Sequence, residues 1–220
     1  MKSFRMLAGA AAALALTAGL AGCASGPAPE ELDQEAVRII RSASRDEGIA
    51  KVDRLDQDAA NEACSRALGK EPAPEVVKAI EAANLKTIRP PGDGKYLGDW
   101  REGEKIAQSG RGLTFTDDAR VVNGGNCYNC HQISRQAISF GTIGPSLYQY
   151  GRLRGVTDPD SPAARPIIEY TWGKLWNARA YNACSHMPRA GHLGILSEAQ
   201  IRHVMALLPD PKSPVNQYTP

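Results

Sequence analysis

Two cysteines and a histidine lie within five consecutive positions of the segment NCYNCHQI, residues 126–133. Cys127, Cys130 and His131 form a C-x-x-C-H motif, which is typical of covalent haem attachment. Two thiols separated by two residues can bond to the two vinyl groups of one porphyrin, and the adjacent histidine then lies under the iron. The motif therefore predicts one covalent haem c, attached through Cys127 and Cys130, with His131 as an iron ligand.

Two other kinds of site use the same cysteine spacing. A thioredoxin-type redox motif expects a βαβ context, and none is apparent around these residues. A zinc site requires more ligands, and the closest candidates, Cys184, His186 and His192, lie far downstream. Haem is the favoured prediction because a histidine adjoins the second cysteine and the chain begins with an export signal.

The second axial ligand decides whether the iron carries electrons or binds small molecules. Met187 precedes Pro188 in a loop rich in proline and glycine, which can hold a thioether rigidly over the open haem face. Methionine ligation raises the reduction potential and leaves no open position. We predict Met187 as this ligand, and His186, His192 and Cys184 are the alternatives.

The first 22 residues have the features of an export signal. Lys2 and Arg5 precede an uninterrupted run of small and apolar residues, which is too short for a confident membrane span. The segment Leu20–Cys23 resembles the lipobox of bacterial lipoproteins, in which the cysteine is lipidated after cleavage. We predict a periplasmic protein anchored by lipid on Cys23, and ordinary cleavage nearby is the alternative.

Bulk charge gives no reason to expect nucleic acid or an anionic membrane as a partner. Once Lys2 and Arg5 are removed with the signal, the 26 basic side chains fall to 24, which equals the 24 acidic ones. Membrane contact is therefore expected only through a lipid on Cys23.

Cys64 and Cys184 remain after the other three cysteines are assigned. In an oxidising compartment two such cysteines suggest a disulfide, and two separate buried thiols are the alternative. The bridge would close a loop of about 120 residues and contribute roughly 4 to 5 kcal/mol by the loop-entropy model.

Apolar residues three or four apart predict helices and no strands. Residues 29–85 are expected to form two or three short helices. The segment 88–94 (IRPPGDG) stops helix and strand alike, so we place a boundary there between an anchor linker with a helical extension, 23–94, and a second domain, 95–220.

Three further helices are predicted in the second domain. The last one carries Met205, which its spacing assigns to packing, and His203, which is assigned to the surface or rim. The first helix is expected to begin at an Asp99 cap, with a hydrogen bond from the Glu102 side chain back to the Asp99 backbone N–H. The second begins near Pro166, and the third begins with a capping box of Ser197 and Gln200.

In this order the features resemble class I cytochromes c, so the implied fold is mainly α, a cytochrome c-like haem domain with a helical N-terminal extension. The resemblance also implies that a proline carbonyl lies near the free nitrogen of the axial histidine and fixes its orientation. The matching residues are Gly103 in the first helix, 127–131, Gly144 with Pro145, Met187 with Pro188, and 197–208.

Three longer strings narrow the resemblance to SoxX, the mono-haem subunit of SoxAX cytochrome complexes, over roughly residues 95–216. They are GTIGPSLYQYGRLRG at 141–155, HMPRAGHLGILSEAQI at 186–201 and DPKSPVN at 210–216. This resemblance implies a complex that oxidatively couples thiosulfate to a cysteine of a carrier protein. The chain would pass electrons from a SoxA-like partner to a small acceptor cytochrome c.

An iron held by histidine and methionine has no vacant position, so we predict one-electron transfer and assign no catalytic residue. One alternative is a stand-alone periplasmic carrier for a respiratory oxidase or reductase. Another is an enzyme or gas sensor in which Met187 leaves the iron five-coordinate. Tyr148, Arg152 and Arg154 lie near haem propionates or the partner by resemblance, or are solvated loop residues, and the sequence does not separate these readings.

Overall fold

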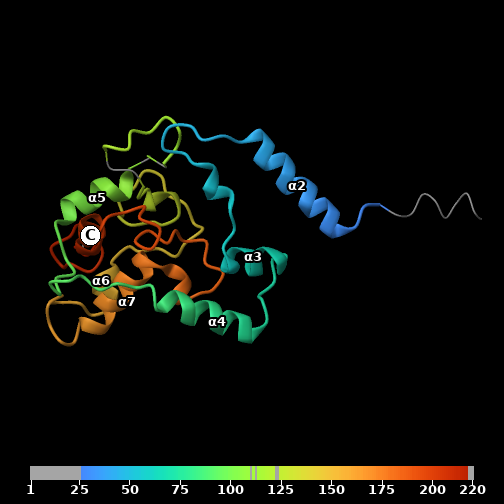
Figure 1. Cartoon of the computed structure of the whole chain (residues 1–220). Coiled ribbons are helices and arrows are strands. Elements are labelled where there is room, and N and C mark those ends of the chain that lie inside the picture. Colours follow the sequence, from blue (N-terminus) through green and yellow to red (C-terminus); the bar gives the residue numbers. More distant parts are fainter. Residues whose placement is uncertain (1–25, 110, 112, 122–123, 218–220) are drawn as a thin grey trace, which may run out of the picture. The chain divides into compact units, whose positions relative to one another are not determined.

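The computed structural model describes residues 26–109, 111, 113–121 and 124–217 (Figure 1). The predicted export signal and Cys23 lie outside them. Within these ranges the chain is helical and forms no β-strand, which confirms the mainly α prediction. The α-helices are α2 (Pro29–Ala43), α3 (Ala59–Arg66), α4 (Pro74–Leu85), α5 (Trp100–Gln108), α6 (Tyr150–Leu153), α7 (Arg165–Trp176) and α8 (Glu198–Leu207), with short 3-10 turns η1 (Val52–Leu55), η2 (Cys127–Asn129) and η3 (Ala178–Ala180).

The chain divides into two compact units, Met1–Arg45 and Asp46–Pro220. The described part of the first unit is α2 with short flanking segments, and no residue of this helix is buried. Its apolar side chains, among them Leu32 and Ile39, are about half exposed. None of the helices in the described ranges is long and apolar enough to cross a membrane.

In the second unit, α8 packs against α5 and α7. The α5–α8 crossing brings two backbones together at Gly103, where a Cβ atom would overlap the carbonyl group of His203. Gly103, Ile106 and Ala107 are the buried residues of α5. Met205 is fully buried on the facing helix, which confirms its assignment to packing.

The start of α5 differs from the predicted capping box. Asp99 accepts a hydrogen bond from the N–H of Arg101, as an N-cap residue does. However, the Asp99 N–H donates to Nδ1 of His203 at 2.9 Å, while Glu102 pairs with Lys105. The predicted return bond from Glu102 was wrong because α8 brings an imidazole within reach. His203 is half-buried at the rim of the crossing.

The other two helix starts match their predictions. Pro166 lies in the first turn of α7, and Ser197 forms a reciprocal capping box with Gln200 at the start of α8. The residues of 29–85 form three α-helices, at the upper end of the predicted number.

Residues 84–89 are held by polar contacts with α7 and the residue that follows it. The indole N–H of Trp172 donates to the carbonyl oxygen of Arg89 at 2.8 Å, and that of Trp176 donates to the carbonyl of Thr87 at 2.9 Å. The buried Asn177 amide donates to the side chain of Asn84. The extension from residue 46 onward is therefore part of the same compact unit as residues 95–217.

Replacing Gly103 with alanine should destabilise the second unit. The added Cβ would press on the backbone of α8, and such overpacking costs about 1–3 kcal/mol. The matched control is Gly92→Ala, because the space around Gly92 is open and its φ is not in the left-handed region. Urea unfolding followed by circular dichroism should give a lower midpoint for Gly103→Ala than for Gly92→Ala. Equal midpoints would contradict the close crossing.

Candidate functional site

The C-x-x-C-H motif is fastened to the C-terminal end of α5. The N–H of Asn126 donates to the carbonyl oxygen of Ile106 at 3.1 Å, and Asn126 has a left-handed φ of 52°. Gly125 precedes it with a φ of +92°, and a Cβ there would overlap the same carbonyl. Glycine tolerates this conformation and this close approach. The Gly124–Gly125 pair is a local sequence signal for this turn, and it was not among the predicted features.

His131 is held in one orientation. Its Nδ1 lies 2.7 Å from the carbonyl oxygen of Pro145, which is the contact that the resemblance to cytochromes c implied. A carbonyl oxygen only accepts, so Nδ1 carries the proton and Nε2 keeps a free lone pair. Gly144 lies against the ring, where a Cβ would overlap it. The imidazole is therefore prepared to bind a metal through Nε2.

Cys127 and Cys130 are free thiols, both half-buried, and are not joined to one another. Burial raises the pKa of the Cys127 thiol to about 11, so this thiol is neutral near pH 7. Reactive redox cysteines and zinc ligands act as thiolates with lowered pKa values. The described residues also form no strand, so the βαβ context of a thioredoxin-type site is missing from them.

The candidates for the second axial ligand have different surroundings. Cys184 forms a disulfide with Cys64, which confirms the predicted bridge and removes Cys184 as an iron or zinc ligand. His186 and His192 are exposed. Met187 is half-buried and packs against the same hydrophobic core as Cys127. Met187 therefore remains our prediction for the ligand opposite His131.

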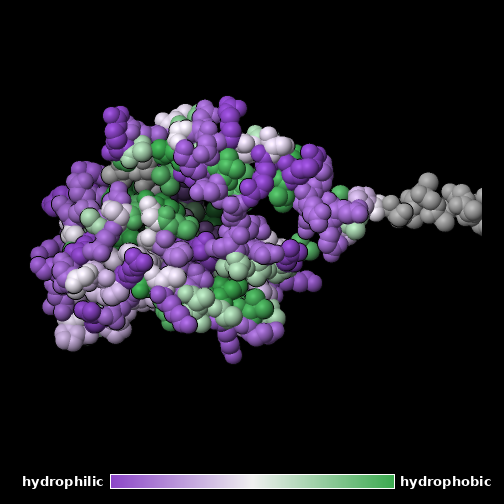
Figure 2. All heavy atoms as spheres, viewed as in Figure 1, coloured by the Kyte–Doolittle hydropathy of each residue, from purple (hydrophilic) through white to green (hydrophobic). Residues whose placement is uncertain are grey.

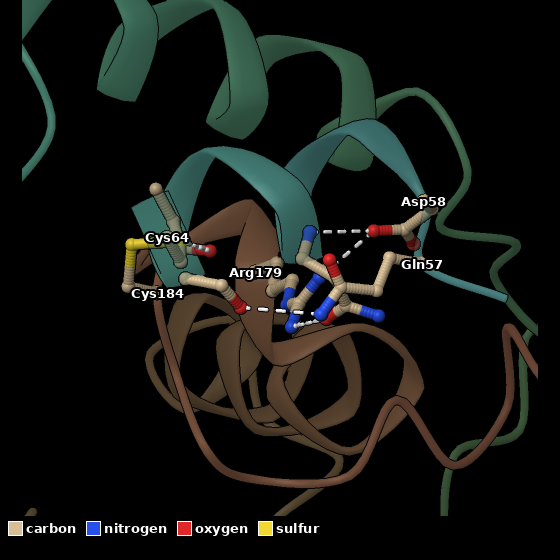
Figure 3. Close-up of a disulfide and its surroundings, with 8 residues drawn as sticks. Gln57, Asp58, Cys64, Arg179 and Cys184 are labelled. Atoms are coloured by element: carbon tan, nitrogen blue, oxygen red, sulfur yellow. Dashed lines mark hydrogen bonds and ion pairs between the residues drawn. A yellow bond between two sulfur atoms is a disulfide. The ribbon is translucent and has the colours of Figure 1, made fainter. Parts of the chain in front are cut away.

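The loop that carries Met187 is fastened on both sides of this residue. The disulfide ties Cys184 to α3 (Figure 3). The guanidinium of Arg189 pairs with Asp58 at 2.6 Å, just before α3. The N–H of His192 donates to the carbonyl of Trp176 at 3.0 Å. These ties restrict the loop to a narrow range of positions.

Apolar side chains are exposed beside the motif. The N–H of Gly141 donates to the carbonyl of Tyr128, and that of Gly144 donates to the carbonyl of Cys130, both at 2.8 Å. Ile138, Phe140 and Ile143 belong to this adjoining segment and are exposed. Figure 2 shows hydrophobic residues exposed among hydrophilic ones on the face that it draws.

The hydroxyl of Tyr128, between the two cysteines, is buried without a hydrogen-bond partner among the described residues. Together with the neighbouring apolar surface, this orphaned group fits a site that a flat, largely apolar cofactor with polar edges would cover. The donor set also fits haem c, because it offers two free thiols, one oriented imidazole and one thioether. The residues present therefore fit the predicted group.

Other residues from the sequence analysis are placed as follows. Arg154 stacks over the ring of Tyr150 at 3.7 Å and donates to its carbonyl, so it packs on its own helix. Tyr148 is half-buried and Arg152 is exposed. In the part of the chain that the structure describes, no group of three or more histidine, cysteine or acidic side chains is placed to hold a metal ion.

Comparison with known proteins shows the family to which the chain belongs. No family model matches the chain. An uncharacterized lipoprotein of Aquifex aeolicus (strain VF5) is 30% identical over 218 residues, which covers 93% of this chain and 97% of the relative. The chain belongs to the family of this lipoprotein. Because the match spans nearly the full length of both proteins, most of the N-terminal extension is part of what they share.

Removal of the disulfide should lower stability substantially. The bridge joins residues 120 positions apart, and the loop-entropy model assigns such a closure about 4 to 5 kcal/mol. The variant Cys64→Ser/Cys184→Ser should therefore unfold at clearly lower urea concentration than the unmodified protein. A mild reductant should shift the unmodified protein to the same midpoint and leave the variant unchanged. An unfolding midpoint that changes neither with the double substitution nor with the reductant would contradict a stabilising role for the disulfide.

Proposed function

We propose that the protein is an exported mono-haem cytochrome c that transfers single electrons. The observation that carries this proposal is the contact between His131 and the carbonyl of Pro145, because it frees Nε2 for an iron beside two unpaired thiols. When bound, haem c supplies a one-electron ferric/ferrous couple.

In this proposal each residue has one task. Cys127 and Cys130 would hold the porphyrin through thioether links, and His131 would hold the iron through Nε2. Met187 would be the second ligand of the iron and would keep small molecules from binding to it. The disulfide and the Arg189–Asp58 ion pair restrain the Met187 loop, and such a restraint would limit rearrangement during electron transfer.

Within this class we propose a SoxX-type subunit of a SoxAX-type complex. The three strings at 141–155, 186–201 and 210–216 support this assignment. The chain would accept electrons from a SoxA-like cytochrome, where thiosulfate is coupled to a carrier-protein cysteine, and deliver them to a small cytochrome c. The chemistry on sulfur would belong to the partner, so no residue of this chain is catalytic.

We further propose that the protein is attached to a membrane in the periplasm through lipid on Cys23. The lipobox-like segment Leu20–Cys23 and the lipoprotein relative both support this location. Helix α2 begins six residues after this cysteine and would connect the anchor to the second unit. A free-diffusing periplasmic form is the alternative that cleavage without lipidation would produce.

The spectrum should depend on Met187 and not on Met205. Protein exported by a host that attaches haem c should be coloured, and its ferrous form should not bind carbon monoxide. Met187→Ala should change the visible spectrum and open the iron to carbon monoxide, because the sixth position becomes vacant. Met205→Leu is the matched control, since this methionine is buried packing. Colourless protein would refute the haem assignment, and a Met187→Ala spectrum identical to wild type would refute Met187 as an iron ligand.

Co-purification should show whether the protein is a subunit of a complex or a stand-alone carrier. The protein isolated from its own cells under mild detergent should bring a SoxA-like cytochrome with it in a one-to-one ratio. The complex should transfer electrons to a small cytochrome c when thiosulfate and a carrier protein are supplied. A lone monomer that exchanges electrons rapidly with a respiratory oxidase would support the alternative carrier instead.

A further inference from the structure

A cavity of about 600 Å³ lies beside the loop that carries Met187, on the side of α3. The Cys64–Cys184 disulfide and Met187 form part of its wall. Three cations also line it, Lys70, Arg179 and Arg189, and none of its lining residues is acidic. Figure 3 shows this region, with Arg179 reaching from η3 toward Asp58 at the start of α3.

The two arginines are nearly buried and share one carboxylate. Their side chains are 12% and 10% exposed, respectively. Asp58 pairs with Arg179 at 3.2 Å and with Arg189 at 2.6 Å, and the amide oxygen of Asn61 accepts a further bond from Arg179. Each guanidinium has five N–H donors, so these partners engage only part of their capacity.

Positive charge is therefore in excess around this cavity. Lys70, Arg179 and Arg189 line the cavity, and the carboxylate of Asp58 pairs with the two arginines. Burial lowers the pKa of Arg179, and the nearby charge of Arg189 lowers it further. Two partly desolvated guanidiniums that repel each other are stabilised by any anion that enters between them.

We propose that this cavity binds a small, doubly charged oxyanion, of which sulfate is the simplest example. Planar guanidinium groups match the oxygen pairs of such anions, and Lys70 adds a flexible point charge. The hydroxyl of Ser185 and the amide of Asn61 also line the cavity and can bond to the remaining oxygens. The volume leaves space for water or for a substituent on the anion.

The burial of the arginines favours a small ion over the acidic surface of a protein. A ligand must enter the cavity to reach groups that are 12% and 10% exposed, and a folded partner cannot do this with its surface alone. Carboxylates of a haem bound to the same chain are a second source of negative charge, so the titration is repeated on protein produced without haem attachment.

The test is calorimetric titration of sulfate, and then of inorganic phosphate, into the full-length protein at constant ionic strength. One saturable site is expected. Lys70→Gln should weaken binding about fivefold, because it removes one charge from the rim. The matched control is Lys78→Gln, an exposed α4 residue outside the cavity, and it should leave the affinity unchanged. Arg189→Lys keeps the positive charge but removes the planar guanidinium that can donate two parallel hydrogen bonds. It should weaken binding more than Lys70→Gln.

Three results would overturn the proposal. They are the absence of saturable binding, equal affinities for Lys70→Gln and Lys78→Gln, and binding that appears only in protein produced without haem attachment. The last result would mean that haem carboxylates already occupy these cations. Circular dichroism of each variant checks that the fold is intact.

The consequence for electron transfer rests on the proposed function. An anion next to Met187 would favour ferric iron, so sulfate should lower the reduction potential. The shift is proportional to the logarithm of the ratio of its dissociation constants for the two oxidation states. Colourless protein that binds sulfate would refute the haem assignment and keep the cavity assignment. Coloured protein that does not bind sulfate would refute the cavity assignment and keep the haem assignment.

Discussion

The close crossing of α5 and α8 at Gly103 is the constraint on which the rest of the second unit depends. It sets the distance between the two helices and allows His203 to reach the first turn of α5. The far end of α5 then presents the carbonyl of Ile106, to which the turn before Cys127 is bonded. A contact between two backbones thus positions the turn that carries Cys127, Cys130 and His131.

Features that depend on neighbours in the sequence were predictable. Caps at Asp99 and Ser197, the proline start of α7 and the motif itself are local patterns, and the structure agrees with the first three. The disulfide was predictable because few cysteines remained to pair. The His203 bond to Asp99 was not, since it joins residues 104 positions apart and follows only from the helix crossing.

Asp58 connects the extension with the candidate site. Its carboxylate accepts from the N–H of Asn61 and so caps α3, and it also pairs with Arg179 and Arg189. No local signal marks this triple role, because the arginines lie more than a hundred residues away. The extension is therefore a structural support for the Met187 loop, and the same contacts enclose the cationic cavity.

The disulfide and the free thiols occur in one chain, and this has a consequence for maturation. The cysteines at 64, 127, 130 and 184 allow three fully oxidised pairings, each of which consumes both motif thiols. Thiol–disulfide exchange requires a thiolate, and burial keeps Cys127 protonated. A chain that folds before oxidants reach this turn would avoid scrambled isomers and keep both motif thiols free.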